Sequence, residues 1–387
     1  MDFQLTEEHK LLQEMVRDFA SKEIAPYVDS WESNHYFPRE IIQKLADLGV
    51  LGMTTPAEYG GTKTDFLSFI LALEELSRFS PSVCLTVSVH ASLFIKAILE
   101  YGSQEQKATY LPKAARGEIL GAFSLSEPGA GSDATNLQTR AIKKGDTYVI
   151  NGIKSWVSTG SEADALILFA VTSAEKERKR LSAFILEKNL PGVQLIKLEK
   201  KMGLHSSPTA QLAFEDCSLP ASNLLGPEGK GLAIALHLLD SSRIGIAAQA
   251  IGLAQSALEL GVRYAKEREA FGQKIANFEA IQFMIADAAT LTEAARLLTY
   301  QAATLVDHNL PFSKEAAMAK LMASEVANKV ASIALQIHGG YGYSQEYRIE
   351  RLYREARVMT IYEGTSEIQR LVIARSLLRE AESLAGS

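Results

Sequence analysis

The feature that most constrains the fold is a change in the period of the hydrophobic residues, which is helical at both ends of the chain and strand-like in the middle. From about residue 120, apolar runs at 148–150 and 153–156 flank Asn151-Gly152, and further runs follow at 181–186 and 210–214. Because Asn-Gly between two such runs is a strong signal for a β-hairpin, we predict a two-residue turn at this pair. The middle of the chain is therefore expected to be a β domain.

The first 115 residues or so carry the start signals of helices. Apolar residues between positions 5 and 19 fall on one helical face, and Thr6 is placed to cap that helix. Asp65 is placed to cap the apolar run at 66–76, and Ser103 with Gln106 matches a capping box. These patterns predict a helical first domain.

The helical period returns in the last third of the chain. Long runs rich in Ala and Leu begin at Leu232 and Phe278, and a third covers 313–338 and stops at Gly339-Gly340. Helices with small apolar residues on several faces bury more than one stripe, which predicts a four-helix bundle whose outer faces meet other subunits. The fold class is therefore α+β and mostly α. We expect an N-terminal helical domain at 1–117, a central β-barrel-like domain at 118–228 and a C-terminal four-helix bundle at 229–387.

Composition narrows the class of protein. The 387 residues carry a formal net charge of −6 with dispersed basic residues, so nucleic acid and anionic lipid are not expected partners. Cys84 and Cys217 stand far apart without clustered His, which predicts neither a disulfide framework nor a metal site. The N-terminus lacks a signal-peptide pattern, and the apolar run at 165–171 is far shorter than the roughly 20 residues of a membrane span. We expect a cytoplasmic protein without membrane insertion, in which the charged run at 175–180 is a solvated hairpin tip.

Residues 129–134, GAGSDA, fit the G-x-G-x-x-A pattern of dinucleotide-binding Rossmann units. Such a fingerprint lies between a strand and a helix and has an acidic residue about 20 positions on, whereas here polar residues follow and position 153 is Ile. We therefore reject the Rossmann interpretation. The glycines expose backbone N–H groups and Ser124, Ser126 and Ser132 add hydroxyls, so the stretch alone fits a ligand-binding loop and a plain tight turn equally well.

Five separated blocks resemble the acyl-CoA dehydrogenase family, in the order in which that family has them. They are GAFSLSEPGAGSD at 121–133, WVSTG at 156–160, REAFGQKIANFEAIQF at 268–283, QIHGGYGYS at 336–344 and REARVMTIYEGTSEIQR at 354–370. The resemblance runs nearly end to end, and LDSSRIGIAAQAIG at 239–252 is similar to the short-chain, butyryl-CoA-type members. It implies helical, β and helical-bundle domains in that order, with FAD as the cofactor.

The resemblance assigns the first two blocks to the flavin. Ser126 matches a hydroxyl position on the pyrimidine side of the ring, Trp156 a side chain that packs on the ring, and Ser158 a donor to flavin N5. By itself, Trp156 is more typical of a core aromatic. The implied cofactor positions in these blocks are Phe123, Leu125, Ser126, Gly131, Ser132, Trp156, Val157 and Ser158.

A second group of matched positions is implied to bind the other end of FAD. Arg268 and Phe271 match contacts to the pyrophosphate and adenine, and 336–340 matches a segment that reaches FAD in a neighbouring subunit. The resemblance thus implies a site shared within a homotetramer, a dimer of dimers, although a Gly pair alone is usually a helix C-cap. The chain departs from the family at Glu279, where Gln is common. The implied positions are Arg268, Phe271, Gln336, Ile337, His338, Gly339, Gly340, Thr365 and Glu367.

Glu363 is the candidate catalytic base. Gly364 permits close approach of a ligand, Thr365 can cap the last helix, and the apolar surroundings raise a carboxylate pKa, yet alone Glu363 is an ordinary loop acid. The resemblance implies that Glu363 takes the α-proton of an acyl thioester while the β-hydride passes to flavin N5, and that the Glu363 N–H and a ribityl hydroxyl polarise the thioester. Some relatives place the base where this chain has Ser242, so Glu363 is the only acid at either position. The implied substrate positions are Ser132, Asp240, Arg243 and Gly364.

The resemblance therefore implies an oxidoreductase of fatty acid β-oxidation. It converts a saturated, short-chain acyl-CoA to trans-2-enoyl-CoA and passes the electrons to electron-transferring flavoprotein. Two other hypotheses stay open. A flavin acyl-CoA oxidase or an enoyl-CoA reductase shares all of these motifs, whereas a non-catalytic FAD- or acyl-CoA-binding subunit predicts a degenerate base or flavin loop, and only Glu279 departs here.

Overall fold

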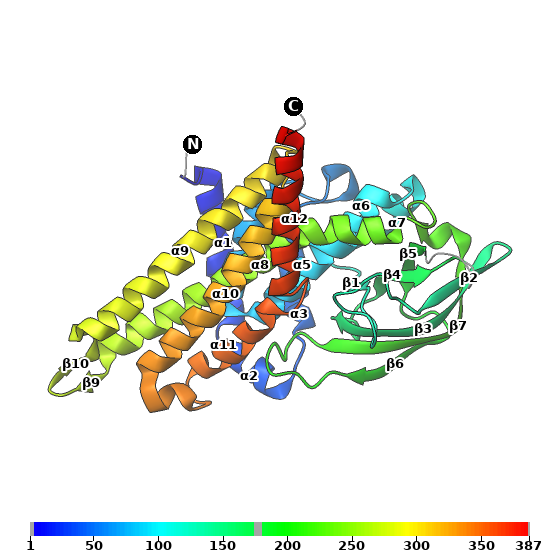
Figure 1. Cartoon of the computed structure of the whole chain (residues 1–387). Coiled ribbons are helices and arrows are strands. Elements are labelled where there is room, and N and C mark those ends of the chain that lie inside the picture. The colour runs from blue at the N-terminus through cyan, green and yellow to red at the C-terminus, as the bar shows by residue number, and fades with distance from the viewer. Residues whose placement is uncertain (1–3, 174–179, 386–387) are drawn as a thin grey trace.

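The structure, a computed structural model, describes residues 4–173 and 180–385, so the hairpin tip predicted at 175–180 lies, apart from Arg180, outside the described residues. Figure 1 shows the long C-terminal helices on one side and the β domain on the other, and the N-terminal helices pack against both. The N-terminal helices are α1 (Glu7–Phe19), α2 (Val28–Asn34), α3 (Arg39–Asp47), α4 (Phe66–Phe79), α5 (Pro81–Val89), α6 (Lys96–Tyr101) and α7 (Gln104–Ala115).

The predicted helix caps of this domain are confirmed. Thr6 Oγ1 accepts a hydrogen bond from the backbone N–H of His9 at 3.2 Å, and Asp65 Oδ1 accepts one from Ser68 at 2.7 Å. Ser103 and Gln106 form both halves of the capping box, at 2.9 and 3.1 Å. These side chains satisfy N–H groups that the first turn of a helix leaves without intrahelical partners.

Among the described residues, two helical stretches are long and apolar enough to cross a membrane by length and composition alone. They are Pro81–Tyr101, which includes a π-helical turn at His90–Ile95, and Gly231–Glu267. In the protein, 89% and 67% of their most apolar windows are buried. This burial is what core helices show, and it explains why apolar residues occur on all faces of α5.

The middle region is a β domain, as expected. Its strands are β1 (Gly121–Ser124), β2 (Arg140–Lys144), β3 (Thr147–Ser158), β4 (Ala165–Val171), β5 (Leu181–Glu187), β6 (Val193–Leu198), β7 (Thr209–Pro220) and β8 (Leu224–Leu225). They form one sheet in the order β6-β7-β3-β2-β4-β5-β8, and β1 pairs in parallel with β4. The described residues between β1 and β2 contain no helix, which agrees with rejecting the Rossmann interpretation.

The prediction of a hairpin turn at Asn151-Gly152 is wrong. Both residues lie inside β3, and the turn falls instead at Gly145-Asp146, between β2 and β3. Gly152 is needed for a different reason, since a Cβ there would lie 2.5 Å from Thr139 Oγ1 on the neighbouring segment. The pairing of β3 with β7 is irregular at this point. Asn-Gly therefore marks a close approach of two backbones rather than a chain reversal.

The C-terminal region is a helical bundle with a small hairpin at one end. Its elements are α8 (Gly231–Glu267), β9 (Glu269–Ala270), β10 (Gln273–Lys274), α9 (Glu279–Asp307), α10 (Ser313–His338), α11 (Arg348–Ala356) and α12 (Ser366–Ala385). Buried alanines on α8, α9 and α10 let these helices pack closely. At 1.5 Å per residue, α8 is about 55 Å long. The β9–β10 hairpin lies at the end of the bundle farthest from the β domain (Figure 1).

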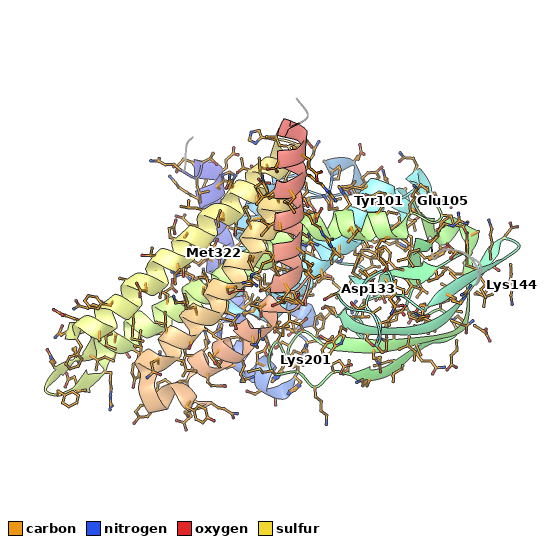
Figure 2. The ribbon with its side chains drawn as sticks, viewed as in Figure 1. Tyr101, Glu105, Asp133, Lys144, Lys201 and Met322 are labelled. Carbon is orange, nitrogen blue, oxygen red and sulfur yellow. The ribbon has the colours of Figure 1, made fainter. Side chains whose placement is uncertain are left out.

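Buried polar contacts fix the β domain to the helices. His90 accepts the N–H of Gly121 at Nδ1 and donates from Nε2 to the carbonyl of Ala114, both at 3.0 Å. Burial lowers the pKa of His90 to about 4, so the ring is neutral and can accept at one nitrogen. Near Lys201, where the lower edge of the β domain meets the helices in Figure 2, buried Glu32 accepts the N–H of His205 at 2.7 Å.

Candidate active site

Glu363 lies in a strained turn just before α12. Its φ is +49° and that of Gly364 is +91°, both in the left-handed region. A Cβ on Gly364 would also lie 2.6 Å from Gln369 Nε2, so this position accepts only glycine without rearrangement. Thr365 Oγ1 accepts the N–H of Ile368 at 3.3 Å, which confirms that it caps the last helix.

Glu363 and Ser242, the two positions at which the resemblance looks for a base, are in contact with one another. Ser242 is fully buried on α8, and its hydroxyl donates a hydrogen bond to Glu363 Oε2. Burial, the largest effect, raises the pKa of Glu363, whereas the Ser242 hydrogen bond and the charges of Lys320 and Arg243 lower it; the net direction is upward. A partly buried carboxylate with a raised pKa is a stronger proton acceptor than a free one, as a catalytic base requires.

Arg243, which follows Ser242 on α8, has a buried side chain. Only 4% of it is exposed, and its Nη1 lies 2.5 Å from Asp240 Oδ1. Its Nε is buried and has no hydrogen-bond partner among the described residues. The side chain is therefore held in an ion pair with Asp240. The guanidinium also contributes positive charge near Glu363.

The Gly-rich loop after β1 is held by a buried ion pair. Lys154 Nζ lies 2.9 Å from Glu127 Oε1 and donates to the carbonyl of Leu125 at 2.8 Å. Glu127 also accepts the N–H groups of Gln138 at 2.6 Å and Thr139 at 3.0 Å. Burial raises the pKa of Glu127, but the Lys154 ammonium and the hydrogen bonds outweigh it and the net pKa is lowered. Sequence reasoning missed both residues, although a Lys at an inward position of β3 was a signal.

The loop itself is closed tightly and leaves its glycines open to the outside. Glu127 and Ala130 exchange two backbone hydrogen bonds, at 3.0 and 3.1 Å. A Cβ on Gly129 or Gly131 would meet no atom within 4 Å, so a ligand can approach the backbone at both glycines. Ser132 is exposed and Ser126 is partly buried. The arrangement favours a ligand-binding loop over a plain turn.

Trp156 is an exposed side chain, so its interpretation as a core aromatic is wrong. Its exposure is 62%, its φ is +60°, and the pairing of β3 with β7 is irregular between Lys154 and Val157. This irregularity turns the indole outward while Val157 stays buried. Ser158 is partly buried one residue further on. The indole ring of Trp156 is therefore exposed, two residues after Lys154, which anchors the Gly-rich loop.

A shared hydrophobic cluster brings this loop close to the base. Phe123 and Leu125 pack against the same buried cluster as Leu239, Val358 and Tyr362, which precedes Glu363. Asp133, at the end of the loop, lies on the side of the β domain that faces the helices (Figure 2). The first and fifth blocks of the resemblance therefore pack against one hydrophobic cluster. The strand that carries the second block lies beside the first, since the Ser155 N–H donates to the Ser126 carbonyl at 2.9 Å.

The third and fourth blocks meet elsewhere, at the far end of the bundle. Arg268 follows the last residue of α8, and at 1.5 Å per residue it lies roughly 39 Å along the helix from Ser242. A cavity of about 590 Å³ lies there, lined by Tyr264, Arg268, Ile337, His338, Gly339 and Gly340 among others. Arg268 stacks over Tyr341, and Phe271 at the hairpin tip is 96% exposed.

The remaining site residues belong to the third, fourth and fifth blocks. Gln336 is exposed, while Ile337 and His338 are buried, His338 being stacked on Tyr264 with ring centroids 4.3 Å apart. Glu279 is the exposed first residue of α9, where the helix dipole favours a carboxylate. Glu367 likewise lies in the first turn of a helix, α12. The structure thus divides the site residues predicted from sequence into two distant groups.

Comparisons with known proteins cover nearly the whole chain. Family models for the acyl-CoA dehydrogenase N-terminal, middle and C-terminal domains match residues 6–118, 122–217 and 229–378. The mitochondrial short-chain specific acyl-CoA dehydrogenase of Rattus norvegicus is 47% identical over 98% of this chain and 92% of its own. An acryloyl-CoA reductase (NADH) of Anaerotignum propionicum is 48% identical over 98% of this chain and 96% of its own.

A solved structure gives the same result for the fold. Butyryl-CoA dehydrogenase from Megasphaera elsdenii is 43% identical, superposes with a TM-score of 0.95, and covers 98% of this chain and 100% of its own. The three family models also match in the order N-terminal, middle and C-terminal domain along the chain. The chain therefore belongs to the acyl-CoA dehydrogenase family and is an oxidoreductase.

Proposed function

We propose that this protein catalyses the FAD-dependent α,β-dehydrogenation of a short-chain acyl-CoA to trans-2-enoyl-CoA, with Glu363 as the base. The observation that carries the proposal is the Glu363 carboxylate, which is partly buried, hydrogen-bonded by Ser242 and raised in pKa beside the aromatic and Gly-rich surfaces of the β domain. A carboxylate of this kind can remove a weakly acidic α-proton.

The residues of the β domain fit a flavin. The open glycines of the loop after β1 leave its backbone accessible, and Trp156 offers an exposed ring face. Ser126 and Ser158 would supply hydroxyls, and Phe123, Leu125 and Val157 apolar contacts; Gly131 and Ser132 complete the set. When bound, FAD would accept the hydride from the β-carbon of the substrate.

The residues around the base have separate tasks in this proposal. Ser242 and the turn at Glu363–Gly364 orient the carboxylate. Burial removes water that would otherwise solvate the carboxylate and make it a weaker base. The Glu363 N–H would donate to the thioester oxygen, where negative charge develops as the α-proton leaves. The Asp240–Arg243 pair would contact the CoA portion at the mouth of the site, with Ser132 and Gly364 as further substrate contacts.

A buried polar bridge supports a short acyl chain. Tyr362 donates its hydroxyl to Gln249 Oε1, and Gln249 Nε2 donates to the carbonyl of Pro81 at 2.7 Å. Gln249 is seven residues beyond Ser242 on the same face of α8, roughly 10 Å along the helix. An apolar chain cannot displace a buried, satisfied polar pair without a large cost, so the pair would end the acyl pocket early.

The distant second group supports a site shared between subunits. Strand β3, which carries Trp156, and the β9–β10 hairpin beside the cavity lie at opposite ends of the protein in Figure 1. Arg268, Phe271 and 336–340 would therefore serve the FAD of a neighbouring chain in a homotetramer. Thr365 and Glu367 would complete the cofactor contacts. The proposed acceptor of the electrons is electron-transferring flavoprotein, and the proposed location is the cytoplasm.

The test is anaerobic addition of butyryl-CoA to the purified, FAD-loaded protein. Loss of the oxidised flavin absorbance is expected within the mixing time or seconds, and longer acyl-CoAs should act more slowly. If no saturated acyl-CoA from C4 to C16 removes this absorbance, the proposal is refuted. Release of hydrogen peroxide during aerobic turnover would identify an oxidase instead.

One observation favours a second candidate, the reverse reaction. The reductase of Anaerotignum propionicum is as similar to this chain as the short-chain dehydrogenase is. The same carboxylic acid would then give a proton to the α-carbon of an enoyl-CoA. Rates with butyryl-CoA plus an artificial acceptor, compared with crotonyl-CoA plus a reduced dye, separate the two directions.

A further inference from the structure

Lys320 is a charged side chain in a place where an apolar one would pack. It lies on α10 and is fully buried. Its ammonium makes one hydrogen bond to a described residue, to the carbonyl oxygen of Gly364 at 2.7 Å, and no described carboxylate forms a salt bridge with it. Burying an ammonium without an ion-pair partner is costly, so its presence at this position points to a use.

The carbonyl that Lys320 holds belongs to the residue after the base. Gln369 Nε2 donates to the same carbonyl at 3.0 Å and to that of Glu363 at 3.2 Å. Two donors from two helices therefore fix a turn in which Glu363 and Gly364 both have positive φ. A non-glycine residue in this conformation relaxes unless its neighbours hold it.

Lys320 also acts on the base through its charge. The charged groups that bear on it are Glu363 in the turn, Arg243 on α8 and Glu367 on α12. Burial lowers the pKa of Lys320 to about 8, with Glu363 opposing this change, so the amine is mostly protonated at neutral pH. In return, the Lys320 charge lowers the pKa of Glu363 against the effect of burial.

We propose that Lys320 is a positioning residue for the Glu363 base: it holds the Gly364 carbonyl in the strained turn, and its charge favours the ionised carboxylate. The proposal rests on the proposed function of Glu363. It assigns two separable contributions to one amine, the orientation of the peptide and the ionisation of the carboxylate. Gln369 shares the first contribution but, being neutral, not the second.

Three variants separate these contributions. Lys320→Met removes both the donor and the charge, Lys320→Gln keeps a donor without charge, and Lys320→Arg keeps both. The rate of flavin reduction by butyryl-CoA is measured by stopped flow from pH 5 to 9. Since removal of the charge raises the pKa of Glu363, the acid limb of the rate profile should move to higher pH for Met and Gln and stay in place for Arg.

The size of the change in rate distinguishes a positioning role of Lys320 from a role in the stability of the fold alone. Lys320→Met should lower the limiting rate by about 10- to 100-fold, because a misplaced base reacts slowly, while KM changes by less than about 3-fold. Lys320→Gln should lose less rate than Met. A uniform loss of rate in all variants without movement of the acid limb would make Lys320 merely structural and overturn the proposal.

A second measurement does not need turnover. The infrared carboxyl band that Glu363→Gln removes is titrated in wild type and in each Lys320 variant. Its midpoint should rise in Met and Gln and not in Arg; an unchanged midpoint overturns the proposal. Failure of the wild type to react with any acyl-CoA counts instead against the proposed function, and the infrared midpoints still decide the role of Lys320.

Discussion

The buried pair Glu127–Lys154 should decide whether the Gly-rich loop can hold a flavin. Lys154→Met leaves Glu127 buried without its cation and frees the Leu125 carbonyl. Removing one partner of a buried pair costs about 3–5 kcal/mol. With an unfolding entropy of about 2.1 cal/mol/K per residue over 387 residues, this corresponds to a fall in Tm of about 4–6 °C if the chain unfolds in one transition.

The assay is thermal unfolding together with titration of the apoprotein by FAD. Lys154→Met should lower Tm by this amount and weaken FAD binding at least about 10-fold, equivalent to 1.4 kcal/mol. The double variant Glu127→Gln with Lys154→Met should recover part of both, since no charge is then buried. Lys144→Met, at the exposed outer end of β2 in Figure 2, is the matched control. If Lys154→Met behaves like that control, the loop does not depend on the pair and the reasoning is refuted.

Two further variants test the surroundings of Glu363. Ser242→Ala removes a hydrogen bond that lowers the pKa of Glu363, so the acid limb of the pH profile of flavin reduction should move to higher pH. The control is Ser241→Ala, because the Ser241 hydroxyl bonds only to Leu238 among the described residues, and this variant should leave the acid limb in place. Gln249→Ala opens the bridge to Tyr362, so the ratio of kcat/KM for C8 over C4 acyl-CoA should rise by about 10-fold or more, given about 1–3 kcal/mol per methylene. The control is Gln255→Ala on the same helix, and an unchanged ratio in Gln249→Ala would show that the bridge does not limit the pocket.

Local signals in the sequence were enough for the helix starts and for the change from helix to strand. Thr6, Asp65 and Ser103 cap their helices because short side chains reach N–H groups two or three residues away, a geometry that sequence spacing describes completely. Asn151-Gly152 misled because the same glycine serves a turn and a close backbone approach. Only the position of Thr139, in the segment just before β2, distinguishes the two.

The site was predictable as a set of positions but not as an arrangement. Glu363 followed from the resemblance, whereas its contact with Ser242 spans 121 residues and depends on how α8 packs. Lys154 and Lys320 were overlooked because lysine is expected at the surface, and their burial depends on partners from distant segments. The exposure of Trp156 likewise depends on an irregular pairing of β3 with β7, which no local sequence pattern predicts.

The most direct test of Glu363 as the base is single-turnover flavin reduction in Glu363→Gln. The variant should bind butyryl-CoA, seen as a shift in the flavin spectrum, with a Kd within about 3-fold of wild type, because the amide is nearly isosteric with the carboxylate. The rate of flavin reduction should then fall by about 10²–10⁴-fold, the usual contribution of a general base. Reduction by the bound variant at a rate within about 10-fold of wild type would show that another group removes the α-proton.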